Sequence, residues 1–392
     1  MTERRGALIA LAFGVGLLVW SLGLFGPAAI LPYLHSERGW SVSVISAAIT
    51  VHFLASALIV SAMPEVHRAL GLRLTVIAGA VAVYLGFIAW TLVPAPQFLF
   101  LAAIMSGAGL ACGSSATVNA IIGSGFTTGR AKALGIALNG AALGGIVLLP
   151  LLSLGGRYLG LTWTLALLGA ATLVVLLLMS SALGRLGTGV ATSAPAGSAP
   201  AAVPMSRRAL FRSANFRSLA LSFSIAIFVQ VGIYSQLINH LRPMFGIDGA
   251  TFAMTGCILL AITGRSAVAW NIGQANRRHV AALTFLMQAA GVVTLAFATT
   301  PVVAIAGCVL FGLGLGNLPL LPPLIAQQEF DEKDFVLVVA SASAVNQIIL
   351  AFGPISLGLL YEASGTYSLP FAIGSVLYLV AAAVVMIHAN LR

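Results

Sequence analysis

Residues 187–217 read GTGVATSAPAGSAPAAVPMSRRALFRSANFR, and they differ in composition from the apolar sequence on either side. The segment is rich in Ala, Gly, Ser and Pro, and it then becomes basic. It lacks the large apolar side chains that form a core, so we expect a flexible linker. With its limits drawn at 184–215, this linker separates a first domain, 1–183, from a second domain, 216–392.

The composition on either side of the linker is that of a membrane protein. The chain has 392 residues, of which 60% are hydrophobic and only 7% are charged. Soluble domains carry about 25% charged residues. Since so few charges cannot cover a water-facing surface, lipid must solvate most of the exterior.

Twelve apolar stretches are long enough to cross a bilayer as helices of about 20 residues. Barrel strands would be shorter and would alternate in polarity, so we predict an all-α membrane protein with two bundles of six helices. The first apolar stretch is longer than the apolar run of a signal peptide, so we interpret it as a membrane span that is retained in the protein. The predicted spans are 7–33, 41–63, 74–93, 97–123, 131–153, 160–182, 216–241, 250–272, 279–298, 301–325, 335–358 and 366–388.

Basic residues are unevenly distributed between the two sides of this arrangement. One side holds only Arg38, Arg157 and Arg242. The other side holds Arg4, Arg5, Arg68, Arg73, Arg130, Lys132, Arg185, Arg207, Arg208, Arg212, Arg217, Arg277, Arg278, Lys333 and Arg392. The positive-inside rule therefore predicts a multi-pass protein of the cytoplasmic (inner) membrane with both termini and the linker in the cytoplasm. The net charge of +10 follows from this topology and requires no nucleic-acid partner.

The two halves also resemble each other in sequence. PLLSLGGRYLGLTWTLALLGA begins at Pro150, and PISLGLLYEASGTYSLPFAIGS begins at Pro354. Each has Pro, then Ser-Leu-Gly, then a Tyr and a Gly, where its fifth span joins its sixth. Together with the six-plus-six division, this match indicates duplicated halves.

Twelve spans, a central cytoplasmic loop and parallel repeats resemble the major facilitator superfamily over essentially the whole chain. In that family a signature follows the second span, and EVHRALGLR keeps Arg68, Gly71 and Arg73 of it but has His67 where an Asp is common. The corresponding loop of the second half, GRSAVAWNIGQANRRH at 264–279, lacks the Asp altogether. The gating contacts attributed to that acid are therefore not expected here.

Within the superfamily the chain is most similar to the monocarboxylate transporter and oxalate/formate exchanger branch. The segments that carry this resemblance are FGPAAILPYLHSERGWSVSVIS at 25–46, INHLRPMFGID at 238–248 and TGR at 263–265. In that branch an arginine of the eighth span binds the substrate carboxylate, and Arg265 occupies the matching position. The exchangers' lysine in the eleventh span has no counterpart, which argues against a dicarboxylate held at both ends.

Arg265 is also the clearest functional signal in the residues themselves. An arginine at the centre of a span costs about 2.5–3.5 kcal/mol on insertion scales, and such residues usually face a polar cavity. Its planar guanidinium suits bidentate binding of a carboxylate. No acidic residue lies clearly inside a predicted span, so a substrate anion is its expected partner. The alternatives are an arginine that extends to the cytoplasmic boundary and one with a structural partner.

Other polar side chains at membrane depth are weaker candidates. Gln230 and Tyr234 are four residues apart and share a helical face, and the alternatives for this face are that it lines a cavity or that it bonds neighbouring helices. Asn119 and Asn346 are candidate substrate contacts with the same alternative. His52 titrates near neutrality and is a candidate for proton coupling, although a neutral histidine bonded between helices is the preferred interpretation.

These observations predict a secondary transporter that moves small monocarboxylates, lactate- or pyruvate-like, by proton coupling or anion exchange. The alternative is a proton-driven exporter of drugs or other amphipathic molecules, although such exporters usually keep a membrane-embedded acid. A sensor or an enzyme is disfavoured because neither a paired acid and base nor a metal constellation is visible. We expect no cofactor and no metal, packing roles for the three cysteines, and function as a monomer.

Overall fold

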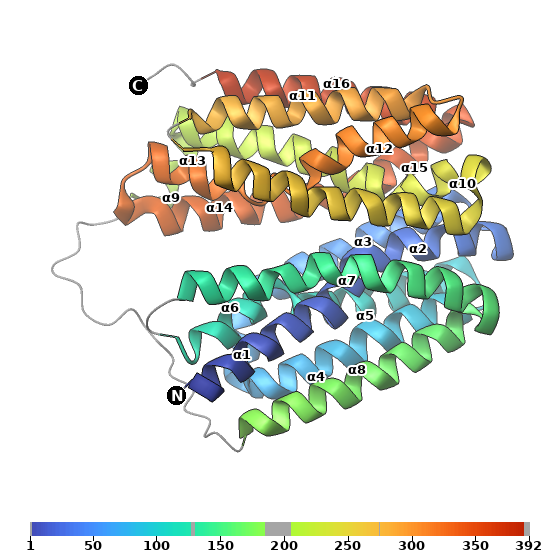
Figure 1. Ribbon diagram of the computed structural model, residues 1–392, viewed down its shortest axis with the longest axis horizontal. Helices are drawn as coiled ribbons and strands as arrows, with labels where there is room; N and C mark the ends of the chain where they lie inside the picture. Colours follow the sequence, from blue (N-terminus) through green and yellow to red (C-terminus); the bar gives the residue numbers. More distant parts are fainter. Residues whose placement is uncertain (1, 127–129, 185–204, 274, 388–392) are drawn as a thin grey trace. The chain divides into compact units, whose positions relative to one another are not determined.

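The computed structural model describes residues 2–126, 130–184, 205–273 and 275–387 (Figure 1). Within these ranges every regular element is a helix, as the sequence predicted. The expected basic residues Arg185 and Arg392 and most of the expected linker lie outside the described residues.

The helices before the linker are α1 (Thr2–Val15), the π-helical η1 (Gly16–Trp20), α2 (Ser21–Arg38), α3 (Val42–Ser61), α4 (Met63–Leu92), α5 (Pro96–Gly113), α6 (Ser115–Gly123), α7 (Arg130–Leu159) and α8 (Leu161–Gly184). Those after it are α9 (Arg207–Arg212), α10 (Ala214–Asn271), α11 (Arg277–Ala296), α12 (Pro301–Leu315), α13 (Leu321–Glu329), α14 (Glu332–Leu350), α15 (Gly353–Ser364) and α16 (Ser368–Met386).

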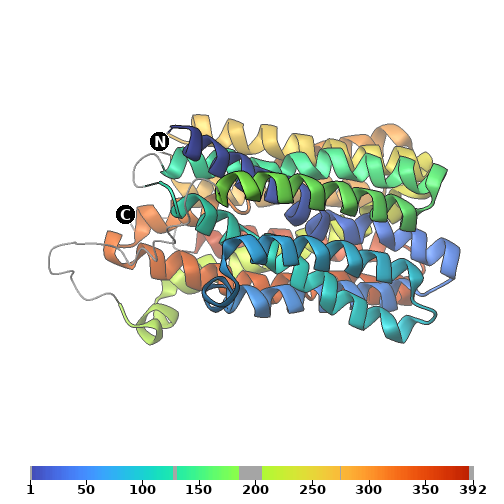
Figure 2. The ribbon, with the colours of Figure 1, turned by 90° about the horizontal axis from the view of Figure 1, so that it is seen from below.

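Two compact units divide the chain. The first comprises residues 1–40 and 51–197, and the second comprises residues 41–50 and 198–392, so the first turns of α3 group with the second unit. In the first unit α4 lies beside α5 and α8, and α7 lies beside α1, η1 and α2 (Figure 2). In the second unit α10, α11, α12 and α16 pack against one another.

The helices account for the twelve predicted spans, with some spans merged and others broken. Among the described residues, ten helical stretches are long and apolar enough to cross a membrane, and α12 is a shorter apolar helix. Two predicted spans fall within the 58 residues of α10, which turns at Gly246, and another is broken between α12 and α13. The break coincides with Pro319, Pro322 and Pro323, because proline supplies no amide hydrogen to continue a helix.

Glycines with positive φ occur at matching joins in the two halves. Gly39 and Gly246 lie between the first and second spans of their halves, with φ of 64° and 69°. Gly71 and Gly273 follow the second spans, and Gly160 and Gly365 follow the fifth spans. A residue with a Cβ is strained in this left-handed region. The matching backbone conformations support the interpretation that the halves are repeats.

Glycines also allow helices to approach closely within each unit. A Cβ on Gly140 would lie 2.3 Å from the carbonyl oxygen of Phe13, and one on Gly144 would lie 2.2 Å from that of Leu17. Small residues in α7 thus allow its backbone to approach that of α1 and η1. In the second unit, a Cβ on Gly264 of α10 would lie 2.0 Å from the carbonyl oxygen of Leu313 in α12.

The expected linker contains one ordered helix, α9. The Ser206 hydroxyl caps it by accepting a hydrogen bond from the amide of Ala209, at 3.2 Å. Leu210 is fully buried. The cap and this buried side chain explain why residues 207–212 are helical although the surrounding composition predicts a flexible segment.

Candidate functional site

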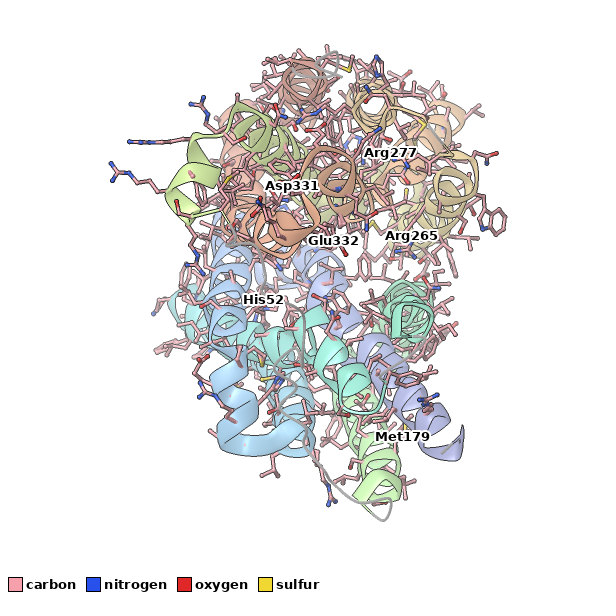
Figure 3. All side chains as sticks on the ribbon, turned by 90° about the vertical axis from the view of Figure 1, so that its left-hand side faces the viewer. His52, Met179, Arg265, Arg277, Asp331 and Glu332 are labelled. Atoms are coloured by element: carbon pink, nitrogen blue, oxygen red, sulfur yellow. The ribbon has the colours of Figure 1, made fainter. Side chains whose placement is uncertain are left out.

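Arg265 lies on the second half of α10, where that helix packs against α12 (Figure 3). It is half-buried, and it lies six residues, about 9 Å along the axis, before α10 ends at Asn271. A Cβ on Gly316 would lie 3.0 Å from the Cβ of Arg265. The Arg265 side chain already interacts with another group of the protein. A substrate would therefore not be its sole partner.

Three buried amide side chains lie on α10, on α11 and directly after α12 in the second unit. Gly316 faces Arg265, whereas Gly314, two residues away, faces Gln288, so the two side chains lie on different sides of this segment. Asn317 follows Gly316 directly, and a Cβ on Gly314 would lie 2.3 Å from Cγ of Gln288 in α11. Gln288 in turn donates a hydrogen bond from Nε2 to Oε1 of Gln230, at 3.2 Å. We call Gln230, Gln288 and Asn317 the amide seam.

The amide seam has spare hydrogen-bonding capacity. Oδ1 of Asn317 and Oε1 of Gln288 are buried, and neither has a hydrogen-bond partner among the described residues. An unpartnered buried acceptor costs about 1–3 kcal/mol. Most buried polar groups in proteins are bonded, so these two oxygens indicate a place where a donor group fits.

The remaining candidates on α10 and α14 lie in the same unit. Tyr234, one turn beyond Gln230, is buried and takes part in an interaction of its own. Asn346 on α14 is half-buried, and its Oδ1 accepts a hydrogen bond from Ser224 at 2.7 Å. Asn346 therefore links α14 to α10, which is the helix-bonding alternative considered for it.

Asn119 belongs to the first unit, apart from the group around Arg265. Its Nδ2 donates to the carbonyl oxygen of Ser115 on its own helix α6, at 2.8 Å. The structure therefore satisfies the donor side of this amide locally. A substrate contact by Asn119 stays a prediction.

His52 is fully buried in the first unit, and both of its ring nitrogens have partners. Nε2 lies 2.9 Å from the carbonyl oxygen of Gly23, and Nδ1 lies 2.8 Å from Oγ of Ser106. A carbonyl oxygen only accepts, so Nε2 carries the proton, and Nδ1 of a neutral ring accepts from the hydroxyl. The rings of Phe87 and Trp90 lie against the imidazole. This geometry favours the structural interpretation of His52.

A second hydrogen-bonded group in the second unit was only partly anticipated. Asn239 donates from Nδ2 to the hydroxyl of Tyr367 at 2.6 Å, and that hydroxyl donates to Oε1 of Gln236 at 3.1 Å. Gln236 donates from Nε2 to Ser46, at 2.7 Å. A tyrosine near a span end is common, so no signal in the sequence distinguishes Tyr367.

The largest surprise is Arg278, which the sequence placed in a loop. It is fully buried, and its Nε and Nη2 donate to the two carboxylate oxygens of Glu329, the latter at 2.7 Å. Nη1 donates to Oγ of Ser218 at 2.8 Å and to the carbonyl oxygen of Val385 at 2.9 Å, and Nη2 donates to that of Asn215 at 3.1 Å. One side chain thereby ties together α11, α13, α10 and α16.

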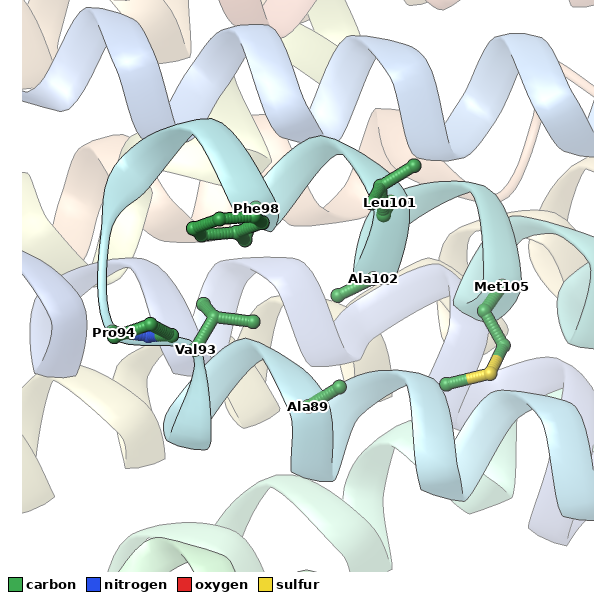
Figure 4. Close-up of a pocket in the computed structure, with 7 residues that line it drawn as sticks. All are labelled: Ala89, Val93, Pro94, Phe98, Leu101, Ala102 and Met105. Carbon is green, nitrogen blue, oxygen red and sulfur yellow. The ribbon is translucent and has the colours of Figure 1, made fainter.

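A hollow of about 420 Å³ lies in the first unit between α4 and α5 (Figure 4). It is lined by Ala89, Val93, Pro94, Phe98, Leu101, Ala102 and Met105, which are all apolar. It contains none of the candidate residues and offers no group that binds an anion. Among the described residues, no group of three or more His, Cys, Asp or Glu side chains is arranged so that it could bind a metal ion.

Comparison with known proteins places this geometry in a family context. The sequence pattern described as Major Facilitator Superfamily matches residues 11–336. No curated protein sequence matches the chain. Solved structures of similar fold include three of transporters. A mutant form of the nucleoside transporter NupG has a TM-score of 0.79 and 14% identity, covering 98% of this chain and 99% of its own.

The other two structures lead to the same conclusion about the fold. The nucleoside transporter NupG itself has a TM-score of 0.76 and 14% identity, with 98% of each chain covered. A bacterial homolog of the human lysosomal transporter Spinster, in an inward-facing and unoccupied conformation, has a TM-score of 0.72 and 15% identity, covering 99% of this chain and 97% of its own. At such identities the likeness concerns the fold alone.

Proposed function

The chain belongs to the Major Facilitator Superfamily, and we propose that within this family of membrane transporters it carries small monocarboxylate anions by alternating access. In such a mechanism a site near the middle of the membrane opens to one side at a time. The substrate class is lactate- or pyruvate-like, and the transporting unit is a single chain. Arg265 binds the carboxylate, with Gln230, Tyr234 and Asn346 of the same unit as candidate substrate contacts, and Asn119 of the first unit stays a separate candidate.

The observation that carries this proposal is the depth of Arg265, which is half-buried and lies about 9 Å before the end of α10. A permanently charged side chain at this depth is costly, and such residues usually mark a substrate path. Gly316 approaches the Cβ of Arg265 and is followed by the buried amide of Asn317, whose Oδ1 has no partner among the described residues, and this supports a polar path near the arginine. A guanidinium and neutral amides together suit a small anion that also has polar substituents.

The related structures do not favour another cargo by themselves. NupG is a nucleoside transporter, but 14% identity with this chain supports the shared fold and not a shared substrate. Export of lipophilic cations is disfavoured because the predicted spans contain no clear acid. The experiment below therefore includes a nucleoside and a lipophilic cation.

Anion exchange is the coupling mode that we favour. Exchange needs no titratable group, whereas symport with a proton needs one. His52 is the histidine that the sequence offered for this role, and its ring is enclosed by partners in the first unit. We also propose that the protein lies in the cytoplasmic membrane with both termini in the cytoplasm, in accord with the charge bias.

Uptake into proteoliposomes tests the proposal. We expect the native protein to take up radiolabelled lactate, and faster when the vesicles contain unlabelled lactate. Arg265→Ala should reduce uptake roughly 100-fold, since loss of one partner of a desolvated charge pair costs about 3 kcal/mol. Arg265→Lys should restore little, because an ammonium group lacks the bidentate geometry.

Arg157→Ala is the matched control, because Arg157 is exposed and lies in the last turn of α7. It should retain native uptake. Native uptake by Arg265→Ala would overturn the role of Arg265. Transport of uridine or of a lipophilic cation, without transport of any carboxylate, would overturn the substrate class.

A further inference from the structure

The short helix α9 presents a basic face that the transport mechanism does not use. Arg207, Arg208 and Arg212 are all exposed, and so is Phe211. Arg207 and Phe211 are four residues apart, as are Arg208 and Arg212, so the four side chains share one face of the helix. Leu210 is fully buried and fixes the opposite face against the protein.

One acid lies just before this helix, since Oδ1 of the buried Asp334 accepts a hydrogen bond from the amide of Met205 at 2.7 Å, and the three arginines of α9 carry a larger positive charge. In the part of the chain that the structure describes, none of the three guanidinium groups forms a hydrogen bond or an ion pair. The sequence contains no acidic residue between Glu65 and Asp248. The face therefore attracts anions, and the exposed aromatic ring among the arginines gives it an apolar centre.

The position of α9 sets this face at the level of the membrane surface. Ser213 ends α9 and is also the residue that precedes α10, whose predicted membrane span begins at residue 216. The ring of Phe211 packs edge-on against Phe216, with centroids 5.0 Å apart. Figure 1 shows α9 at the end of the second unit where α16 also ends. Helices with basic and aromatic side chains at this level lie in the lipid headgroup region.

We infer that α9 is a binding site for the phosphate headgroups of anionic lipids, with Arg208 and Arg212 binding the phosphate and Phe211 inserted among the acyl chains. Arginine pairs with phosphate through two parallel hydrogen bonds, so two arginines one turn apart suit a single headgroup. Each basic residue near an anionic surface contributes attraction equivalent to about a fivefold change in affinity. The site holds the start of α10 at a defined depth.

Native mass spectrometry of the delipidated full-length protein, titrated with phosphatidylglycerol or phosphatidylcholine, tests this site. We expect preferential retention of phosphatidylglycerol and a roughly 25-fold weaker affinity for it in R208Q/R212Q. The control is R68Q/R73Q, which removes the same charge from exposed arginines of α4. It should bind phosphatidylglycerol as the native protein does, and both variants should keep the native melting temperature.

Three outcomes would overturn the inference. Equal weakening in both variants would show that net charge alone is responsible. Unchanged binding in R208Q/R212Q would show that α9 is not the site. Displacement of the lipid by millimolar inorganic phosphate would identify a site for free anions instead.

Discussion

His52 shows how a residue with an obvious chemical use can have a structural one. Its imidazole joins α3 to α2 through Gly23 and to α5 through Ser106. Trp90 also donates to the Ser106 hydroxyl, at 3.2 Å. The neutral ring is thereby completely hydrogen-bonded, and protonation would require a charge in an enclosed, largely aromatic environment.

We therefore predict that His52→Ala lowers stability and leaves the pH dependence of transport unchanged. The substitution removes two buried hydrogen bonds and leaves a cavity, at a cost of about 2–4 kcal/mol. Thermal unfolding of the purified protein measures the first effect, and lactate exchange between pH 5.5 and pH 8 measures the second. His279→Ala is the control, since His279 is exposed on α11. A stable His52→Ala protein whose exchange no longer responds to pH would instead identify His52 as the proton-coupling group.

The burial of Arg278 and its ion pair with Glu329 could not be predicted from the sequence. Arg277 and Arg278 are adjacent in a basic loop, and nothing in their pattern distinguishes the half-buried arginine from the fully buried one. The difference arises because α13 ends at Glu329 and places a carboxylate against the first turn of α11. Such a pair depends on where two distant elements meet, which a sequence pattern does not specify.

At the scale of elements, the crossing of α10 and α12 controls the position of Arg265. A Cβ on Gly264 would lie 2.0 Å from the carbonyl oxygen of Leu313. A Cβ on Gly316 would lie 2.0 Å from the carbonyl oxygen of Ala261. Glycine is required at both positions, because real Cβ atoms do not approach that closely. The backbone of α10 is thus in close contact with α12 and the residue that follows it, directly before Arg265.

We predict that Gly264→Ala forces this crossing apart, lowers stability by about 1–3 kcal/mol and impairs carboxylate uptake. The added methyl group displaces α10 from α12 at the residue next to Arg265. Thermal unfolding and proteoliposome uptake measure the two effects.

Gly256→Ala on the same helix is the control. A Cβ there meets nothing within 4 Å, so the higher helix propensity of alanine should leave stability unchanged or raise it. Equal behaviour of the two variants would show that the close crossing has no bearing on Arg265.

Elements were predictable from the sequence to the extent that apolar length determines them. The span predicted at 366–388 is matched by α16 at Ser368–Met386, whereas the span predicted at 301–325 is broken by a proline-rich segment between α12 and α13. α4 begins at Met63, eleven residues before the predicted span at 74, because a further helical stretch precedes that span and turns at Gly71.

Of the candidate site, Arg265 and Gln230 were identified from the sequence as candidates. Gln288 and Asn317 were not, since their importance depends on unpartnered oxygens that only the packing reveals.

At the scale of the whole molecule, duplication explains features that the halves share. The positive-φ glycines occur in three pairs at equivalent joins, although the sequences around them have diverged. Backbone conformation at a turn is harder to change than the side chains of a lipid-facing span. The repeat therefore persists in the turns more clearly than in the composition of the spans.

The same duplication, together with the charge bias, fixes a testable orientation. Six spans in each half return the chain to the side on which it started, and the arginines concentrate on that side. Arg73 and Arg157 are both exposed, at joins predicted to lie on opposite sides of the membrane. A cysteine at each position is thus expected to react with a membrane-impermeant maleimide from opposite faces.

We predict that Arg73→Cys is labelled in inside-out vesicles and that Arg157→Cys is labelled in right-side-out vesicles. The native protein provides a low background, because Cys257 and Cys308 are buried and Cys112 is half-buried within α5. Labelling is measured by the mass shift of the purified chain. The opposite pattern would place the termini, α9 and the join after α10 outside the cell, where anionic cytoplasmic lipid is absent. The positive-inside rule states that short loops rich in Lys and Arg stay in the cytoplasm during membrane insertion. With the opposite labelling pattern this rule would not explain the uneven distribution of arginines, which would need another cause.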